Sequence, residues 1–233
     1  MNKPECNHVL KETDNAGAIG IFKCVRCGET IVGGAQAVEK YRKASGFSFL
    51  TTSKTPKLTV LVLLFTGLLT GLQFVIPGLL PALQRTPATI SSHEWWRLIT
   101  PFFIERGGWK EITFNLVSLA IVGAIAERLW GCRRWLMFYL LGGFVGECAG
   151  LAWKPDGAGS SVAACGLLGA LSAWMLFRIK TWPARFGAMF IIIGALVLTA
   201  IRDLHGPPLL AGICAASVIL WRESPRQKPE PMG

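Results

Sequence analysis

The sequence predicts an all-α membrane protein, a six-span helical bundle that follows a small N-terminal head. Three observations lead to this fold class. Of the 233 residues, 52% are hydrophobic and only 16% are charged, and the apolar residues stand in long blocks. Blocks of this kind exclude a disordered chain and a nucleic-acid-binding domain, although the formal net charge is +10. The odd number of cysteines, 7 in all, excludes a secreted disulfide scaffold.

The segment 1–35 is predicted to be a zinc-binding, zinc-ribbon-like head. The candidate ligands are Cys6, His8, Cys24 and Cys27. The second pair is a Cys-x-x-Cys followed by Gly28, a spacing typical of structural zinc sites. Four protein ligands leave no open coordination position, so we expect a structural zinc ion and no catalytic cofactor. A redox pair, or cysteines without a metal in a flexible tail, is the alternative.

A polar linker and the membrane domain follow the head. The linker covers residues 36–57 and carries a basic cluster of Lys40, Arg42 and Lys43, which we expect near anionic head groups. The transmembrane domain is predicted over 58–222. The remaining residues, 223–233, are predicted to form a cytoplasmic tail.

Six apolar segments predict six membrane spans. They cover residues 58–76, 112–126, 135–153, 162–177, 186–201 and 204–221. A bilayer core of ~30 Å needs about 20 apolar residues, so some segments are short and five crossings remain an alternative. Lys and Arg gather in the head, in alternate gaps and in the tail, which predicts that both termini are cytoplasmic. We therefore expect an integral protein of the plasma or inner membrane.

Small residues four positions apart predict close helix packing inside the bundle. The pairs and stripes are Gly67 with Gly71, Gly142 with Gly146 and Gly150, and Gly169 with Ala173. In lipid, such spacing lets two helix backbones approach each other.

A cysteine and a histidine are predicted to lie at the same depth. Cys165 stands near the start of the fourth span and His205 near the start of the sixth, and both spans run from outside to inside. A helix N-terminus favours a thiolate, and a nearby imidazole accepts its proton, which is the arrangement of a Cys/His dyad. The alternatives are that Cys165 is a small packing residue and that His205 bonds a carbonyl group.

Several motifs in a fixed order resemble one family. They are Trp96-Arg97-Leu98-Ile99-Thr100 with Phe103, Gly107-Gly108-Trp109 with Asn115, Glu127-Arg128 with Gly131, Tyr139 with Gly142-Gly143, Ala163-Ala164-Cys165-Gly166 with Gly169, and His205 with Ala211-Gly212. Over about 58–222 the chain resembles the rhomboid intramembrane proteases. The resemblance implies a rhomboid-like bundle in which Cys165 replaces the serine of a Gly-x-Ser-Gly segment. It also implies that His205 is the catalytic histidine and that Asn115 is an oxyanion donor.

The sequence departs from that family in the second span. The family's two histidines there fall near Arg106 and at Glu111. A carboxylate at Glu111 would repel an oxyanion, and the loss of one oxyanion donor costs ~10²–10³ in rate. A thiol, which ionises more readily than a hydroxyl, offsets part of that loss.

Two functions follow from these features. The first is a rhomboid-like intramembrane endopeptidase, a hydrolase that cleaves transmembrane helices near their outer end through Cys165, His205 and Asn115. The second is a catalytically inactive relative, a pseudoprotease, that binds transmembrane helices while its zinc head recruits a cytoplasmic partner. The protease is favoured because His205 is kept and Cys165, a competent nucleophile, replaces the serine. Neither function requires an organic cofactor or a nucleic acid partner.

Overall fold

The computed structural model describes residues 10–16, 19–24, 30–33 and 55–223, and the chain divides into two compact units, 1–54 and 55–233. The first unit contains an antiparallel sheet in the order β1-β2-β3. Its strands are β1 (Leu10–Ala16), β2 (Ile19–Cys24) and β3 (Thr30–Gly33). Phe22 of the central strand pairs with Glu12 on one side and with Ile31 on the other.

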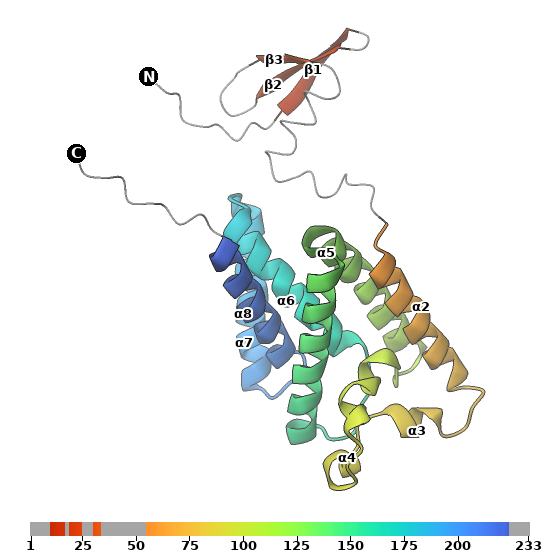
Figure 1. Cartoon of the computed structure of the whole chain (residues 1–233). Helices are drawn as coiled ribbons and strands as arrows, with labels where there is room; N and C mark the ends of the chain where they lie inside the picture. The colour runs from red at the N-terminus through yellow and green to blue at the C-terminus, as the bar shows by residue number, and fades with distance from the viewer. Residues whose placement is uncertain (1–9, 17–18, 25–29, 34–54, 224–233) are drawn as a thin grey trace. The chain divides into compact units, whose positions relative to one another are not determined.

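The second unit is helical. It consists of α2 (Lys57–Leu72), α3 (Leu79–Leu83), α4 (Ala88–Ser91), the 3₁₀ turns η2 (Trp95–Leu98) and η3 (Thr100–Phe103), α5 (Trp109–Trp153), α6 (Ser161–Arg178), α7 (Trp182–Ala200) and α8 (Gly206–Glu223) (Figure 1). By length and composition, α5, α6 and α7 are the 3 described helices that qualify to cross a membrane, and α2 is a shorter apolar helix. The protein is therefore an integral membrane protein with a helical membrane domain. The count of six spans stays a prediction.

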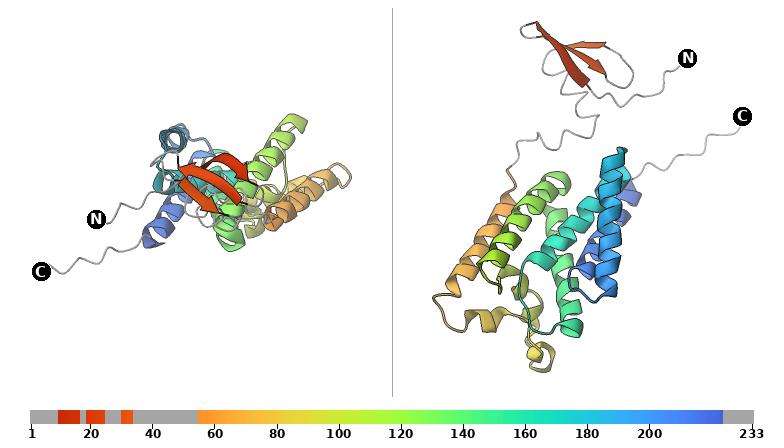
Figure 2. Two further views of the ribbon diagram at one scale, coloured as in Figure 1. Left: turned by 90° about the horizontal axis from the view of Figure 1, so that it is seen from above. Right: turned by 180° about the vertical axis from the view of Figure 1, so that it is seen from behind.

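Helix α5 is a hairpin of two helices. A straight helix of 45 residues would be ~67 Å long, more than twice the ~30 Å of a bilayer core. Gly131 breaks it with φ 74°, a conformation that residues with a Cβ rarely adopt. Across the break, Trp135 Nε1 donates a hydrogen bond of 2.9 Å to Gly123 O, a pairing that a straight helix would not allow. Figure 2 shows the two halves side by side. The two halves of α5 thus contain the predicted segments 112–126 and 135–153, one segment in each half.

Glycines join α5, α6 and α8 at the centre of the bundle. A Cβ on Gly142 of α5 would lie 2.6 Å from the Cα of Gly166 of α6. A Cβ on Gly212 of α8 would collide with the carbonyl oxygen of the same Gly166. Because no side chain separates them, the three backbones come into direct contact. Gly142 belongs to the predicted stripe, whereas Gly166 and Gly212 were not among the predicted packing positions.

The predicted pair Gly67 and Gly71 of α2 does not bring two helix backbones together within the described chain. No described atom lies within 4 Å of the position that a Cβ would occupy at Gly67 or Gly71 of α2. The prediction was wrong for this pair because the face of α2 that packs on the bundle is a different one. Its buried residues are Thr59, Val62, Thr66 and Thr70.

A buried ion pair holds the loops at the start of α6. Arg85 pairs with Glu147 of α5, and the two side chains are 1% and 2% exposed. The guanidinium also donates to the carbonyls of Lys154 (2.8 Å) and Pro155 (3.2 Å). Since the two buried charges are paired and the guanidinium bonds two carbonyls of the loop that leads into α6, this loop is held against Arg85.

Candidate active site

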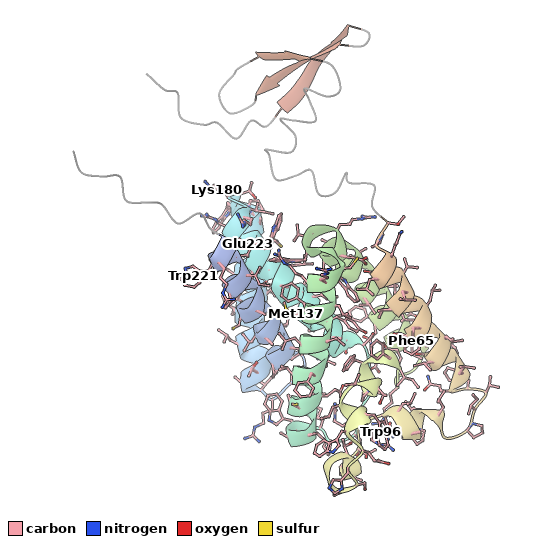
Figure 3. All side chains as sticks on the ribbon, in the orientation of Figure 1. Phe65, Trp96, Met137, Lys180, Trp221 and Glu223 are labelled. Carbon is pink, nitrogen blue, oxygen red and sulfur yellow. The ribbon has the colours of Figure 1, made fainter. Side chains whose placement is uncertain are left out.

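Helices α6 and α8 run parallel and begin at the same end of the membrane domain. At their C-terminal ends, Arg178 lies 3.7 Å from Glu223. At their N-terminal ends, Ser161 contacts His205. Figure 3 shows Trp96 at one end of this unit, with Lys180 and Glu223 at the other. The predicted equal depth of the starts of α6 and α8 is therefore present in the structure.

The imidazole of His205 connects a carboxylate to a hydroxyl. Its Nδ1 lies 2.7 Å from Asp203 Oδ1, and its Nε2 lies 3.1 Å from Ser161 Oγ. A carboxylate only accepts, so it favours the tautomer in which Nδ1 carries the proton. Nε2 then has a free lone pair, and the Ser161 hydroxyl donates to it. The order carboxylate, imidazole, hydroxyl is that of a serine hydrolase triad.

Asp203 is held in place by several contacts. The backbone N–H of His205 donates to the same Oδ1 at 3.0 Å, and Lys154 Nζ lies 3.9 Å from Oδ2. Partial burial by itself raises the pKa of Asp203. The hydrogen bonds from His205 and the nearby charges of His205 and Lys154 outweigh burial, so that the pKa lies below its usual value. The carboxylate is therefore ionised at neutral pH, as a partner of a donating imidazole must be.

A second polar cluster borders the serine. Asn115 Nδ2 donates to Glu105 Oε2 at 2.7 Å, and the backbone N–H of Ser160 donates to Glu105 Oε1 at 2.9 Å. A Cβ on Gly159 would lie 3.3 Å from Glu105 Oε2, 3.7 Å from Asn115 Nδ2 and 3.8 Å from Ser161 Oγ. The carboxylate oxygen, the amide nitrogen and the serine hydroxyl thus border one small space beside Gly159. The missing side chain of this glycine leaves that space open.

The predicted pairing of His205 with Cys165 is corrected by this geometry. Both ring nitrogens of His205 are engaged, one by Asp203 and the other by Ser161. Cys165 lies one helical turn further along α6, and among residues 55–223 no hydrogen bond involves its thiol. The residue that faces the imidazole is a serine, and Cys165 does not replace it.

A signal for Ser161 was present in the sequence. Gly159-Ser160-Ser161-Val162 keeps the first glycine and the serine of a Gly-x-Ser-Gly segment and loses only the last glycine. The alignment used in the prediction, Ala163-Ala164-Cys165-Gly166, has the last glycine of that segment but neither its first glycine nor its serine. Asp203, two residues before the histidine, was also missed, because spacing alone does not tell whether a loop turns a carboxylate toward its neighbour.

The two residues that stand where the family has histidines, Arg106 and Glu111, do not lie as the sequence predicted. Arg106 and Glu111 are both exposed, and the Glu111 carboxylate lies against Gly107 in the first turn of α5. It forms no hydrogen bond with Asn115 or Ser161. The carboxylate inside the site is instead Glu105, which is 1% exposed and which the sequence analysis did not select.

The predicted zinc ligands lie mostly outside the described residues. Cys24 ends β2, whereas Cys6, His8 and Cys27 fall in segments that the structure does not describe. Within the described ranges no group of 3 or more His, Cys, Asp or Glu side chains gathers around a common point. Zinc binding stays a prediction.

Comparison with known proteins places these residues in a family. A family model for the Rhomboid domain matches residues 92–221, which include Asn115, Ser161 and His205. The chain belongs to the rhomboid family. "Rhomboid protease GluP" of Bacillus subtilis is 37% identical over 105 residues, 45% of this chain and 20% of the relative. "Rhomboid-type serine protease 2" of Emericella nidulans is 37% identical over 92 residues, 40% of this chain and 18% of the relative.

A plant relative extends this set. "RHOMBOID-like protein 1" of Arabidopsis thaliana is 29% identical over 106 residues, 45% of this chain and 27% of the relative. The chain therefore spans about a fifth to a quarter of the length of these three relatives. The rhomboid match begins at residue 92, so the sheet of the first unit lies outside it.

Proposed function

We propose that this rhomboid is an intramembrane serine endopeptidase, with Ser161 as the nucleophile and His205 as the general base and acid. The observation that carries the proposal is the chain of hydrogen bonds from Asp203 through His205 to Ser161 Oγ, with distances of 2.7 Å and 3.1 Å. Both are within the range that proton transfer requires. The names of the bacterial and fungal relatives, a rhomboid protease and a serine protease, agree with this reading.

The first half of the reaction forms an acyl-enzyme. Ser161 Oγ attacks the carbonyl carbon of the scissile peptide bond while its proton passes to His205 Nε2. The Asp203 carboxylate stabilises the imidazolium and holds the ring in its tautomer. The tetrahedral intermediate then collapses and the C–N bond breaks. The leaving amine takes the proton from Nε2.

The second half releases the new carboxyl terminus. A water molecule gives a proton to His205 Nε2 and attacks the Ser161 ester, and Oγ recovers its proton when the ester bond breaks. In both halves the negative oxygen needs donors. Asn115 Nδ2 borders the space beside Gly159, and we assign it and the backbone N–H of Ser161 as the two donors.

The substrates we propose are transmembrane helices that unwind near their outer end. The polar residues of the site come from the starts of α6 and α8 and from the segment before α5, all at one end of the bundle. With both termini cytoplasmic, that end faces the outside of a plasma or inner membrane. The side chain of His205 is 42% exposed, so water reaches the base.

The test is reconstitution of the purified protein in liposomes with a model transmembrane substrate. A serine-reactive phosphonate is added in parallel, and the labelled peptide is identified by mass spectrometry. We expect cleavage, and we expect the label on Ser161. Loss of both in His205→Ala, with retention of both in Cys165→Ala, supports the proposal. A label on Cys165, or a cysteine-reactive inhibitor that blocks cleavage in the native protein but not in Cys165→Ala, restores the Cys/His dyad.

The inactive helix-binding protein is the competing outcome of the same experiment. It would show as a native protein that retains the substrate helix during purification and neither cleaves it nor takes the label. The hydrogen-bonded Ser161 favours the protease, because a protein that only binds helices has no need of an oriented nucleophile.

For the first unit we propose a structural zinc ion bound by Cys6, His8, Cys24 and Cys27. The position of Cys24 at the end of β2 suits a ligand that would tie this strand to its flanking segments. Metal analysis of the full chain is expected to give one zinc per molecule, with loss of the metal in Cys24→Ser. A native protein without zinc would contradict the proposal.

A further inference from the structure

Glu105 is a fully buried carboxylate that bridges the two sides of the site. It is 1% exposed, and both of its oxygens accept hydrogen bonds. Oε1 accepts from the backbone N–H of Ser160 at 2.9 Å and from the Ser160 hydroxyl. Oε2 accepts from Asn115 Nδ2 at 2.7 Å. One side chain thus connects α5, which carries the oxyanion amide, to the residue immediately before Ser161.

The backbone of Glu105 is held from the other side by α2 and the turn after it. Its N–H donates to Thr70 Oγ1 at 3.1 Å, and its carbonyl accepts from Gln73 Nε2 at 2.9 Å. The carboxylate therefore has a defined position before substrate arrives. A carboxylate beside the first N–H groups of α6 is also favoured by the helix dipole.

The chemistry of an asparagine side chain explains why an acceptor is needed at this place. An amide group presents either its N–H₂ or its oxygen, and the two faces have almost the same shape. Only the N–H₂ face stabilises an oxyanion. In this structure the three atoms nearest to the position of a Cβ at Gly159 are Glu105 Oε2, Asn115 Nδ2 and Ser161 Oγ, so the amide faces this position with its nitrogen and not with its oxygen. A carboxylate only accepts, so Glu105 permits that orientation of the amide and opposes the reverse one.

We propose that Glu105 is a positioning residue that fixes the amide of Asn115 with its N–H₂ toward the oxyanion. This inference rests on the proposed protease function and adds a residue to it. In this role the group acts through the amide of Asn115, since a carboxylate only accepts and is not itself an oxyanion donor.

Replacement by glutamine tests the inference, because Glu105→Gln keeps the shape and removes one acceptor. The backbone N–H of Ser160 cannot turn, so the glutamine oxygen stays on Ser160 and its N–H₂ faces Asn115 Nδ2. Two facing donors force the amide of Asn115 to reverse. We expect kcat for cleavage of the model substrate in liposomes to fall about 10²-fold, with KM little changed.

A double-mutant cycle separates positioning from a general structural role. Asn115→Ala is expected to lower kcat by ~10²–10³. In that background, Glu105→Gln should cause no further fall, because the group through which it acts is gone. If Glu105→Gln lowers kcat by the same factor with and without Asn115→Ala, so that the two effects multiply, the inference is wrong. If Glu105→Gln does not fold, Glu105→Asp, which keeps two acceptors at a shorter reach, takes its place in the cycle.

A matched control uses another buried carboxylate. Glu127 of α5 is 6% exposed, and it accepts hydrogen bonds from the backbone N–H groups of Leu58 (2.9 Å) and Thr59 (2.7 Å). It follows Asn115 by 12 residues of helix, or ~18 Å. Glu127→Gln is expected to lower the melting temperature and to leave kcat unchanged well below that temperature. If the native protein cleaves and Glu105→Gln cleaves at the native rate, the inference fails and the proposed function stands. If the native protein cleaves nothing, the proposed function fails, and the inference falls with it.

Discussion

Helices α6 and α7 have nearly the same length and a similar apolar composition, but they occupy different environments. Of the 18 residues of α6, ten are buried, from Val162 to Ala173. Of the 19 residues of α7, the buried ones are Ala188 and Ala195. The difference lies in small residues at the contacts, since Gly166 and Gly169 of α6 touch the backbones of α5 and α8. Hydropathy detects a helix of this kind, but small residues alone do not place it at the centre of the bundle, since Gly187 and Gly194 of α7 meet no described backbone within 4 Å.

The tighter packing of α6 has a functional consequence. The helix with direct backbone contacts carries Ser161 at its first position, where the surrounding helices fix the direction of the hydroxyl. A nucleophile must be held within a fraction of an ångström of its base, and a rigid element provides this better than a loosely packed one.

The largest expected effect comes from the first residue of α6. Ser161→Ala removes the nucleophile, and we expect cleavage of a model transmembrane substrate in liposomes to fall at least ~10⁴-fold. The fold should be intact by circular dichroism, since one hydroxyl is lost. Full activity in this variant would show that Ser161 is not the nucleophile.

The next effect concerns the loop that joins α7 to α8. Asp203→Asn keeps the shape but removes the carboxylate from His205 Nδ1, so the ring is free to take the wrong tautomer. We expect kcat to fall by ~10²–10⁴, measured in the same cleavage assay. Lys154→Met, which removes only the charge 3.9 Å from Asp203, is the control and should change kcat far less.

The same carboxylate makes a prediction about pH. The pKa of Asp203 in the folded protein lies below its ordinary value, so its contacts stabilise the fold above the ordinary Asp pKa of ~3.9. That contribution is lost as the pH falls through the lower, folded-state pKa. Melting temperatures of the native protein and of Asp203→Asn should therefore differ at neutral pH and converge in strong acid.

A matched pair of glycines tests the packing difference directly. Gly166→Ala of α6 places a methyl group against the backbones of α5 and α8, whereas Gly194→Ala of α7 meets no described atom within 4 Å. We expect the first variant to lose ~1–3 kcal/mol and the second to be neutral or slightly more stable. Thermal unfolding in one detergent measures both. Equal effects would mean that the two helices are packed alike.

The smallest effect is expected one turn below the nucleophile. Cys165→Ala should change cleavage less than about threefold, because the thiol has no hydrogen bond in the described chain. Cys165→Ser should behave in the same way. A loss comparable with that of Ser161→Ala would show that the thiol takes part in the reaction.

Much of the membrane domain was predictable from residue pattern. The predicted segment 162–177 matches α6, and 204–221 matches α8 within two residues at each end. Gly131, quoted for its place in a family motif, is the break in α5. The packing pair Gly67 and Gly71 was wrong, because spacing on one helix does not tell which face meets a neighbour.

The site was predicted in part. His205 followed from its rarity, since an imidazole near the start of an apolar span has few roles, and Asn115 followed from the family resemblance. Glu105 and Asp203 could not be identified, because each lies in a loop before a helix and their partners are distant in sequence or depend on a turn. Counting back from Asn115 placed one of the family's second-span histidines at Glu111, but the structure shows that Glu111 is exposed.

By itself, the sequence determined the helices, the membrane character and the family. These depend on apolar run length and on motifs in a fixed order, which are properties of the chain. Only the tertiary structure favours Ser161 over Cys165 as the proposed nucleophile. The two residues stand four positions apart and share one face of α6, so the sequence pattern suits both. The register of α8 against α6 places the imidazole beside the first of them, because glycines at the crossing allow the two backbones to meet in a single close-packed arrangement.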